Sequence, residues 1–517
     1  MSKKDPTSPA TTSDAYDCMA PKWRLIDTLL SGTVAMREAG QEWTPRHEQE
    51  STVNYDFRLG QTVLLNMTEE TLDQLSGKPF SEPMKLGDNV PSAIKGEEDD
   101  SNSGLTYDID LQGNNLDVFC QQWFREGLGK AFAHVLVDMP RPSPRPDNQP
   151  RTLNDDRREG LRPYWNLIKP ECLIFARAEM VNGTETLVHA RILEHYTVQD
   201  GFAEVEKCRI RVLERGHVQL WEPHPTKKKD GKPVWIMVDE WDTALQVIPL
   251  VTFYANRTGF MTGKPPLEDL AWLNVAHWNS SSDQRNILRV ARFPMLACSG
   301  ASAEDSDPVV IGPHQVLYNS DPQGKFYYVE HTGAAIEQGS KDLEALEEQM
   351  AMYGQQFLRE KPGNETATGR ALDTAENNSD LSAWAAKFED AVAQALDFTA
   401  EWMSLSEEGG SVEVVKNFNK AAEDAEGFKA IQNARDKRDL SRFTLLTSMV
   451  QRGYLPKDFN IDEDQERLLE EQDTALARAG FDLDPMGNPR KPALDEDGNP
   501  INTEDQNTPN PEDEEVE

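Results

Sequence analysis

Three arginines that lie close together in the sequence could bind anionic groups. Arg285, Arg289 and Arg292 are four and three residues apart, within a segment, 265–294, that we predict to be one long helix. At these intervals the side chains project from the same face of a helix. Guanidinium groups in such a row can contact nucleic-acid phosphates or form salt bridges with carboxylates of a neighbouring subunit. Because basic residues also favour helix ends, the sequence leaves these interpretations open.

Motifs of the common catalytic classes are missing from the sequence. Residues 125–130, REGLGK, contain Gly-x-Gly-Lys, but they lack the spacing of a phosphate-binding loop and fall within a predicted helix. There is neither a GxSxG nor an HExxH motif. The acidic runs 97–100 and 512–515 are consecutive residues, whereas a two-metal nuclease needs carboxylates that converge from different elements. We therefore predict that the protein is not an enzyme.

The cysteines and histidines do not form a metal-binding or disulfide pattern. The five cysteines are widely separated and include no CxxC pair, which favours reduced, partly buried thiols. His189 and His195 lie in a strand-like region without an acidic partner at ligand spacing. We predict neither a metal site nor any other cofactor.

The charge balance is strongly acidic, with 90 Asp and Glu residues against 53 Lys and Arg residues and a formal net charge of −37. Tight binding to nucleic acid depends on basic residues that displace counterions, so this charge argues against a tight DNA binder. It is compatible with an acidic conduit through which DNA slides. Residues 495–517 contain ten acidic residues and no basic one, so we predict that 481–517 form a disordered tail.

The N-terminal residues are polar, and no apolar run approaches the roughly 18 residues of a membrane span. We expect a soluble, intracellular protein in which residues 1–20 are disordered.

The first half of the chain indicates an α/β region. Residues 21–40 form a predicted helix with Trp23, Ile26, Leu30 and Val34 on one face. Two further stretches, 87–110 and the proline-rich 140–151, are predicted loops. Further helices are expected at 55–75 and 116–130, and strands at 133–137, 191–198, 207–213, 218–221, 234–238 and 248–254. An Asp-Gly turn within 227–232 indicates a hairpin between the fourth and fifth of these strands.

The second half indicates long helices around a small β-rich insert. The insert, 295–339, alternates apolar residues with acidic and glycine turns. Apolar residues then recur at intervals of three and four, which predicts two helices that pack on long neighbours: Leu343, Leu346, Met350, Tyr353 and Phe357, then Leu381, Trp384, Phe388, Ala391, Ala395, Phe398 and Trp402. Pro362-Gly363-Asn364 breaks the chain between them. A short strand at 412–418 and helices at 426–451 and 462–478 complete the pattern.

This order of parts resembles the portal (head-to-tail connector) proteins of tailed bacteriophages. The resemblance covers most of residues 20–480 at the level of element order. It is sharpest in RPYWNLIKPE (162–171), IPLVTFYANRTG (248–259), PPLEDLAWLN (265–274) with SSSDQR (280–285), and ETATGRA (365–371).

The resemblance implies an α+β portal fold with an α/β wing, a helical stem, a small β-containing clip and a helical crown. Carried onto this chain, the parts are the wing at 21–264, a stem helix at 265–294, the clip at 295–339, a second stem helix at 340–358, a channel loop at 359–368, a long wing helix and short strand at 367–421, and the crown at 422–480.

The resemblance also implies a dodecameric ring at one capsid vertex of a virion, assembled in the host cytoplasm. Such a ring conducts double-stranded DNA during packaging and ejection. Its partners would be terminase, head–tail adaptor or tail proteins and the major capsid protein, with no membrane partner. The implied DNA-channel residues are Arg285, Arg289, Arg292, Arg359 and Lys361, and the implied channel loop includes Glu360, Pro362, Gly363, Asn364, Glu365 and Thr366.

Two other functions are compatible with the sequence. A different virion structural protein, such as a head–tail adaptor or minor capsid protein, is the nearer alternative, although adaptors are generally shorter and lack the helix–insert–helix order. A cytoplasmic enzyme with a β-rich middle domain would need a convergent pocket.

Overall fold

The computed structural model describes residues 4–96, 104–142, 152, 155, 158–229, 232–292, 295–299, 322–329, 333–356, 380–416, 418, 435, 437, 441–451, 459–461, 463–464 and 467–468. The chain divides into two compact units, 1–418 and 419–517, with mixed α and β structure in the first. In the second unit the structure describes the helix α12 (Arg442–Gln451). Across the described residues, no helix is both long and apolar enough to cross a membrane.

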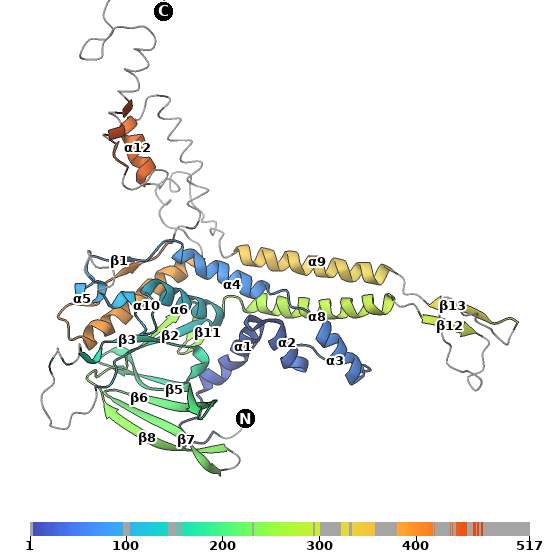
Figure 1. Cartoon of the computed structure of the whole chain (residues 1–517), viewed down its shortest axis with the longest axis horizontal. Coiled ribbons are helices and arrows are strands. Elements are labelled where there is room, and N and C mark those ends of the chain that lie inside the picture. The colour runs from blue at the N-terminus through green and yellow to red at the C-terminus, as the bar shows by residue number, and fades with distance from the viewer. Residues whose placement is uncertain are drawn as a thin grey trace, which may run out of the picture. The chain divides into compact units, whose positions relative to one another are not determined.

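A three-stranded antiparallel sheet is at the centre of the first unit. Its order is β3 (Tyr164–Ile168), β2 (Phe132–Asp138) and β9 (Leu250–Tyr254). The helices α6 (Leu116–Lys130) and α10 (Asp380–Trp402) pack on it (Figure 1). These elements confirm the predicted helix at 116–130 and the buried strands at 133–137 and 248–254.

An aromatic cluster fills the space between this sheet and its helices. The ring of Phe388 on α10 lies 5.0 Å from that of Phe253 and 5.2 Å from that of Phe124, between centroids. Gly127 of α6 faces the same cluster, and a Cβ there would be 2.3 Å from Cδ1 of Phe253. The glycine therefore allows α6 to contact β9 closely.

The predicted apolar seam of α10 is confirmed, because Leu381, Trp384, Phe388, Ala391 and Ala395 are all buried. The helix ends at Trp402, and residues 367–379 of the predicted helix and strand segment 367–421 are outside the described part.

A five-stranded antiparallel sheet, in the order β4-β5-β6-β7-β8, forms a second layer (Figure 1). It confirms the predicted hairpin around 227–232, in which Lys229 pairs with Lys232 on either side of a turn that is not described. β4 (Leu173–Val181) was not among the predicted strands. The other strands are longer than predicted because they pair along most of their length: β5 (Thr184–Asp200), β6 (Ala203–Glu214), β7 (His217–Lys229) and β8 (Lys232–Asp242).

The N-terminal region differs from the prediction. Helix α1 (Asp14–Leu30) begins inside the segment that was predicted to be disordered, and the Ser13 hydroxyl caps it by accepting from the backbone N–H of Tyr16. The chain breaks at Gly32, which has a φ of +79°, before α2 (Gly32–Ala39). Because this break rotates the second helix, Val34 is 66% exposed although Trp23 is buried.

The predicted helix at 55–75 is two helices, α3 (Thr52–Gln61) and α4 (Met67–Gly77). The side chain of Asn66 caps α4 by accepting from the backbone N–H of Glu69, which starts a new helix inside the predicted one.

The segment predicted as a loop at 87–110 is largely structured where it is described. It contains α5 (Ser92–Lys95) and the 3₁₀ turn η3 (Leu105–Tyr107), and it buries Ile94 and Ile109 in the core.

Shorter elements join these parts. They are the 3₁₀ turns η1 (Gly40–Glu42), η2 (Lys78–Phe80) and η4 (Pro170–Cys172), the pair β1 (Lys85–Leu86) with β14 (Val412–Glu413), and the pair β10 (Arg257–Gly259) with β11 (Thr262–Gly263).

The helix–insert–helix segment consists of α8 (Glu268–Ala291), the antiparallel strands β12 (Met295–Ser299) and β13 (Lys325–Val329), and α9 (Gly333–Gln356). α9 begins at Gly333, earlier than the predicted 340, because residues 333–339 continue its helix rather than the insert.

His134 should make the stability of the fold sensitive to acid. It is fully buried in β2, with Nδ1 2.9 Å from Oγ1 of Thr252, and burial lowers the pKa of His134 to about 3. From about pH 6.5 down to about 3, the unfolded chain binds a proton that the folded chain does not, so this residue's contribution falls by about 1.4 kcal/mol per pH unit. Between pH 6.5 and 5, the free energy of unfolding of His134→Gln should therefore fall by on the order of 2 kcal/mol less than that of wild type, as measured by urea denaturation.

The control is His195→Gln, which replaces a more exposed histidine on β5 and should keep the wild-type dependence. Equal pH slopes for His134→Gln and wild type would contradict the prediction.

Candidate functional site: the three-helix layer of α3, α8 and α9

α8 lies between α3 on one side and α9 on the other (Figure 1). On the α9 side, Tyr353 donates to Oδ2 of Asp269 at 3.1 Å, and Gln284 Nε2 donates to the carbonyl of Ile336 at 2.8 Å. The pairing of early α8 residues with late α9 residues makes the two helices antiparallel. Between these contacts, Ser280 donates to Oδ2 of Asp342 at 2.8 Å.

The apolar seam predicted for the second helix packs along this contact. Met350 is fully buried, and Leu343, Leu346 and Tyr353 are half-buried, whereas Phe357 lies outside the described residues. Near the other end, a Cβ on Gly339 would be 2.1 Å from Oε1 of Gln284, so glycine permits a close approach of the helices there.

On the opposite side of α8, a buried arginine of α3 contacts α8. Arg58 is 3% exposed, and its guanidinium donates to both carboxylate oxygens of Glu50 at 2.9 Å. It also donates to Oγ of Ser282 on α8 at 3.2 Å. The hydrogen bond from Arg58 is the main reason that the pKa of Glu50 is below its ordinary value. Arg58 was not among the predicted site residues, although its place on the face of α3 that carries Tyr55 and Leu59 was a usable signal.

The predicted arginine row lies on this same side of the layer. Arg285 donates to the carbonyl of Gln61 at 3.1 Å, and the guanidinium of Arg289 lies 3.6 Å from the centroid of the Phe57 ring, a cation–π contact. Both contacts are with α3, away from α9. Arg292 is exposed just beyond the end of α8.

The other predicted site residues cannot be placed. Arg359, Lys361 and the loop residues Glu360, Pro362, Gly363, Asn364, Glu365 and Thr366 lie outside the described residues.

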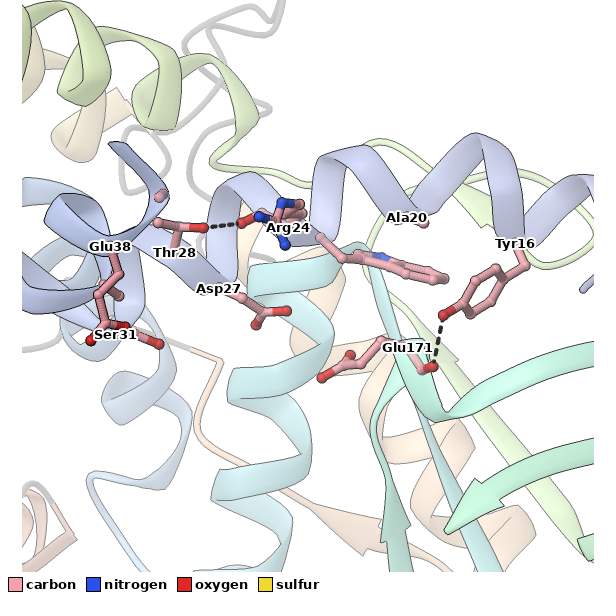
Figure 2. A pocket seen from close by; sticks show the side chains of 11 residues that line it. Tyr16, Ala20, Arg24, Asp27, Thr28, Ser31, Glu38 and Glu171 are labelled. Carbon is pink, nitrogen blue, oxygen red and sulfur yellow. Dashed lines mark hydrogen bonds between the residues drawn. The ribbon is translucent and has the colours of Figure 1, made fainter. Parts of the chain in front are cut away.

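An open pocket of about 450 Å³ lies beside α1, and Figure 2 shows the side chains that line it, among them Asp27 and Glu171. Two of these carboxylates pair with Lys130, whose side chain is 2% exposed: its ammonium group lies 2.8 Å from Oδ1 of Asp27 and 2.7 Å from Oε1 of Glu171, and 3.3 Å from Oε2 of Glu126. Burial alone would lower the pKa of Lys130, but the three carboxylates outweigh it and raise that pKa above its ordinary value.

These carboxylates are therefore used to neutralise a buried lysine, which is a structural role. Among the residues that the structure describes, no cluster of three or more His, Cys, Asp and Glu side chains could hold a metal ion. His189 and His195, for which no acidic partner was predicted, each face one carboxylate across β5 and β6, Glu214 and Glu206, both at 3.2 Å. Such single pairs do not form a metal site.

Comparisons with known proteins give one family match and several structural similarities. Residues 266–403, which include α8, α9 and α10, match a family described as a domain of unknown function (DUF4055). No curated protein matches the chain.

Among solved structures, a chain in the virion of a native gene transfer agent particle is similar at a TM-score of 0.38 and 12% identity, covering 82% of this chain and 99% of that one. A chain in the neck of an empty gene transfer agent particle, computed with C6 symmetry, is similar at a TM-score of 0.35 and 12% identity, covering 75% of this chain and 89% of that one. A chain in the neck of a native particle, computed with C12 symmetry, is similar at a TM-score of 0.36 and 11% identity, covering 75% of this chain and 89% of that one. TM-scores in this range do not by themselves indicate a shared fold.

Proposed function

We propose that the chain is the subunit of a portal: a dodecameric ring at one capsid vertex that conducts viral double-stranded DNA and docks terminase and head–tail adaptor or tail proteins. The observation that carries this proposal is the helix–insert–helix segment. α8 and α9 form an antiparallel pair, and the two ends of the insert between them pair as β12 and β13. This is the arrangement expected of a stem that carries a clip, and the clip would meet the motor and then the adaptor.

The charge of the chain supports a conduit rather than a tight DNA-binding site. At a formal net charge of −37, a ring of such subunits would repel phosphate over most of its surface, so only a few basic groups would contact the moving duplex. For these groups we propose Arg292, Arg359 and Lys361. Arg285 and Arg289 are weaker candidates because their guanidinium groups already contact α3.

The test of the proposed function is the assembly state of the purified full-length protein. We expect negative-stain electron microscopy to show rings with a central hole, and native mass spectrometry to give a mass near twelve subunits. A compact dimer or tetramer without a hole would overturn the portal proposal and favour a different virion protein or an enzyme.

Replacing Arg359 and Lys361 together with alanine should reduce DNA packaging or retention severalfold, because fewer cations would then contact the duplex. Ring assembly should be unchanged. The measurement is the amount of nuclease-protected DNA per particle, with Lys227→Ala/Lys228→Ala on β7 as a control that removes two lysines elsewhere. Packaging equal to wild type would remove these two residues from the DNA path while leaving the ring proposal intact.

A further inference from the structure

The two outer faces of the three-helix layer differ in chemistry. On the outer side of α3, Val53 is 77% exposed and Phe57 is 41% exposed, four residues apart on one helical face. On the outer side of α9, Glu344, Glu348 and Met352 form a row at intervals of four residues, and Met352 is 53% exposed. The α3 face therefore carries two exposed apolar side chains, and the α9 face carries one.

The charges beside these apolar residues are opposite. Arg285 and Arg289 border the face of α3, and neither has a carboxylate partner within the described part of the chain. The α3 face also carries one acidic residue, Asp56. On α9, Glu344 and Glu348 have no cationic partner among the residues described, whereas the neighbouring Glu337 is neutralised by Lys341 at 2.7 Å. The α3 side therefore has two arginines, and the α9 side two glutamates, that could neutralise each other.

We infer that the outer face of α3, together with Arg285 and Arg289, binds the outer face of α9 in a second copy of this chain. The inference rests on the ring proposed above and names the surfaces through which its subunits meet. Because the two faces are different and lie on opposite sides of α8, the contact is head-to-tail, the type that generates rings when the rotation closes.

A protein partner fits the α3 face better than DNA does. The guanidinium of Arg289 lies on the Phe57 ring beside exposed Val53, so a ligand on this face would cover apolar surface as well as charge. Phosphate groups would leave that apolar surface exposed to water. Arginine and aromatic side chains together are typical of the centre of a protein interface. Arg285 and Arg289 would then lie between subunits rather than along the DNA.

Charge reversal tests the contact. Arg285→Glu/Arg289→Glu and Glu344→Arg/Glu348→Arg should each reduce the assembled fraction at least about tenfold, as close charge pairs at interfaces do, in sedimentation velocity and native mass spectrometry. The variant with all four changes should assemble again, because the opposite charges then face each other in exchanged positions. Lys227→Glu/Lys228→Glu, which reverses two exposed charges on β7, should assemble like wild type. Circular dichroism and thermal unfolding establish that each variant is folded.

Cysteine cross-linking separates failure of the contact from failure of the ring. In a Cys18→Ser background, Val53→Cys/Met352→Cys should give a ladder of linked copies on oxidation, ending at the ring size. An open ladder without closed rings would support the contact and overturn the portal. Rings without cross-links, and insensitive to charge reversal, would overturn the contact and leave the portal. A chain that stays monomeric and does not cross-link would overturn both.

Discussion

Replacing Lys130 with methionine should lower the free energy of unfolding by about 3–5 kcal/mol, the usual cost of breaking a buried ion cluster from one side. The lysine side chain is 2% exposed and joins three elements: α1 through Asp27, α6 through Glu126 and η4 through Glu171. Methionine fills a similar volume but leaves three carboxylates close together without a cation. The measurement is urea denaturation at pH 7.

The matched control is Lys341→Met, which removes a lysine from an exposed i,i+4 pair with Glu337 on α9. Such pairs contribute about 0.3–0.5 kcal/mol, so the control should be close to wild type. Acid gives a second readout. Burial already raises the pKa of Asp27, and the variant removes the cation that opposes this shift, so the deficit of Lys130→Met should shrink as the pH falls from 7 to 4. A loss below about 1 kcal/mol at pH 7 would show that the carboxylates turn to solvent without cost.

The parts of this fold that the sequence predicted are those with a regular apolar period. Met350 on α9, and Trp384 and Phe388 on α10, recur at helical intervals, and each is buried against a neighbouring element. The alternating residues of β5 and β6 predicted strands for the same reason, because a half-buried strand repeats every second residue.

Capping signals were present in the sequence but are short compared with an apolar period. Ser13 and Asn66 each start a helix with a single side-chain contact, at places where we had predicted a disordered segment and a continuous helix. In both places, the signal of a single capping side chain was therefore weaker than the polar or apolar pattern of the roughly twenty residues around it.

The charged contacts of the site could not be predicted because their partners are far apart in the chain. Lys130 pairs with Glu171, and Arg58 contacts Ser282, more than two hundred positions away. A sequence shows which residues carry charge, but tertiary structure decides which charges meet. For that reason the sequence predicted that the arginines of α8 share one face of the helix, but it did not predict that this face contacts α3.

Replacing Arg58 with methionine should also lower the free energy of unfolding by about 3–5 kcal/mol, because it leaves the carboxylate of Glu50, 7% exposed, without its cation. Chemical denaturation measures this loss. The control is Arg24→Met, which breaks the more exposed pair with Glu42 and should cost about 1 kcal/mol or less.

Two further measurements show that the loss comes from an unpaired Glu50. Arg58 holds the pKa of Glu50 below its ordinary value, so the pair's contribution is present at neutral pH and disappears as the pH falls through that lowered pKa. The gap between wild type and Arg58→Met should therefore narrow in acid. At pH 7, Arg58→Met/Glu50→Gln should be more stable than Arg58→Met, since the second change removes the buried charge. If the double variant is no more stable than the single one, the loss comes from the contacts of Arg58 with α8 and the preceding loop. In that case Arg58 stabilises the layer mainly by joining α3 to α8, in addition to the contacts that Arg285 and Arg289 make with α3.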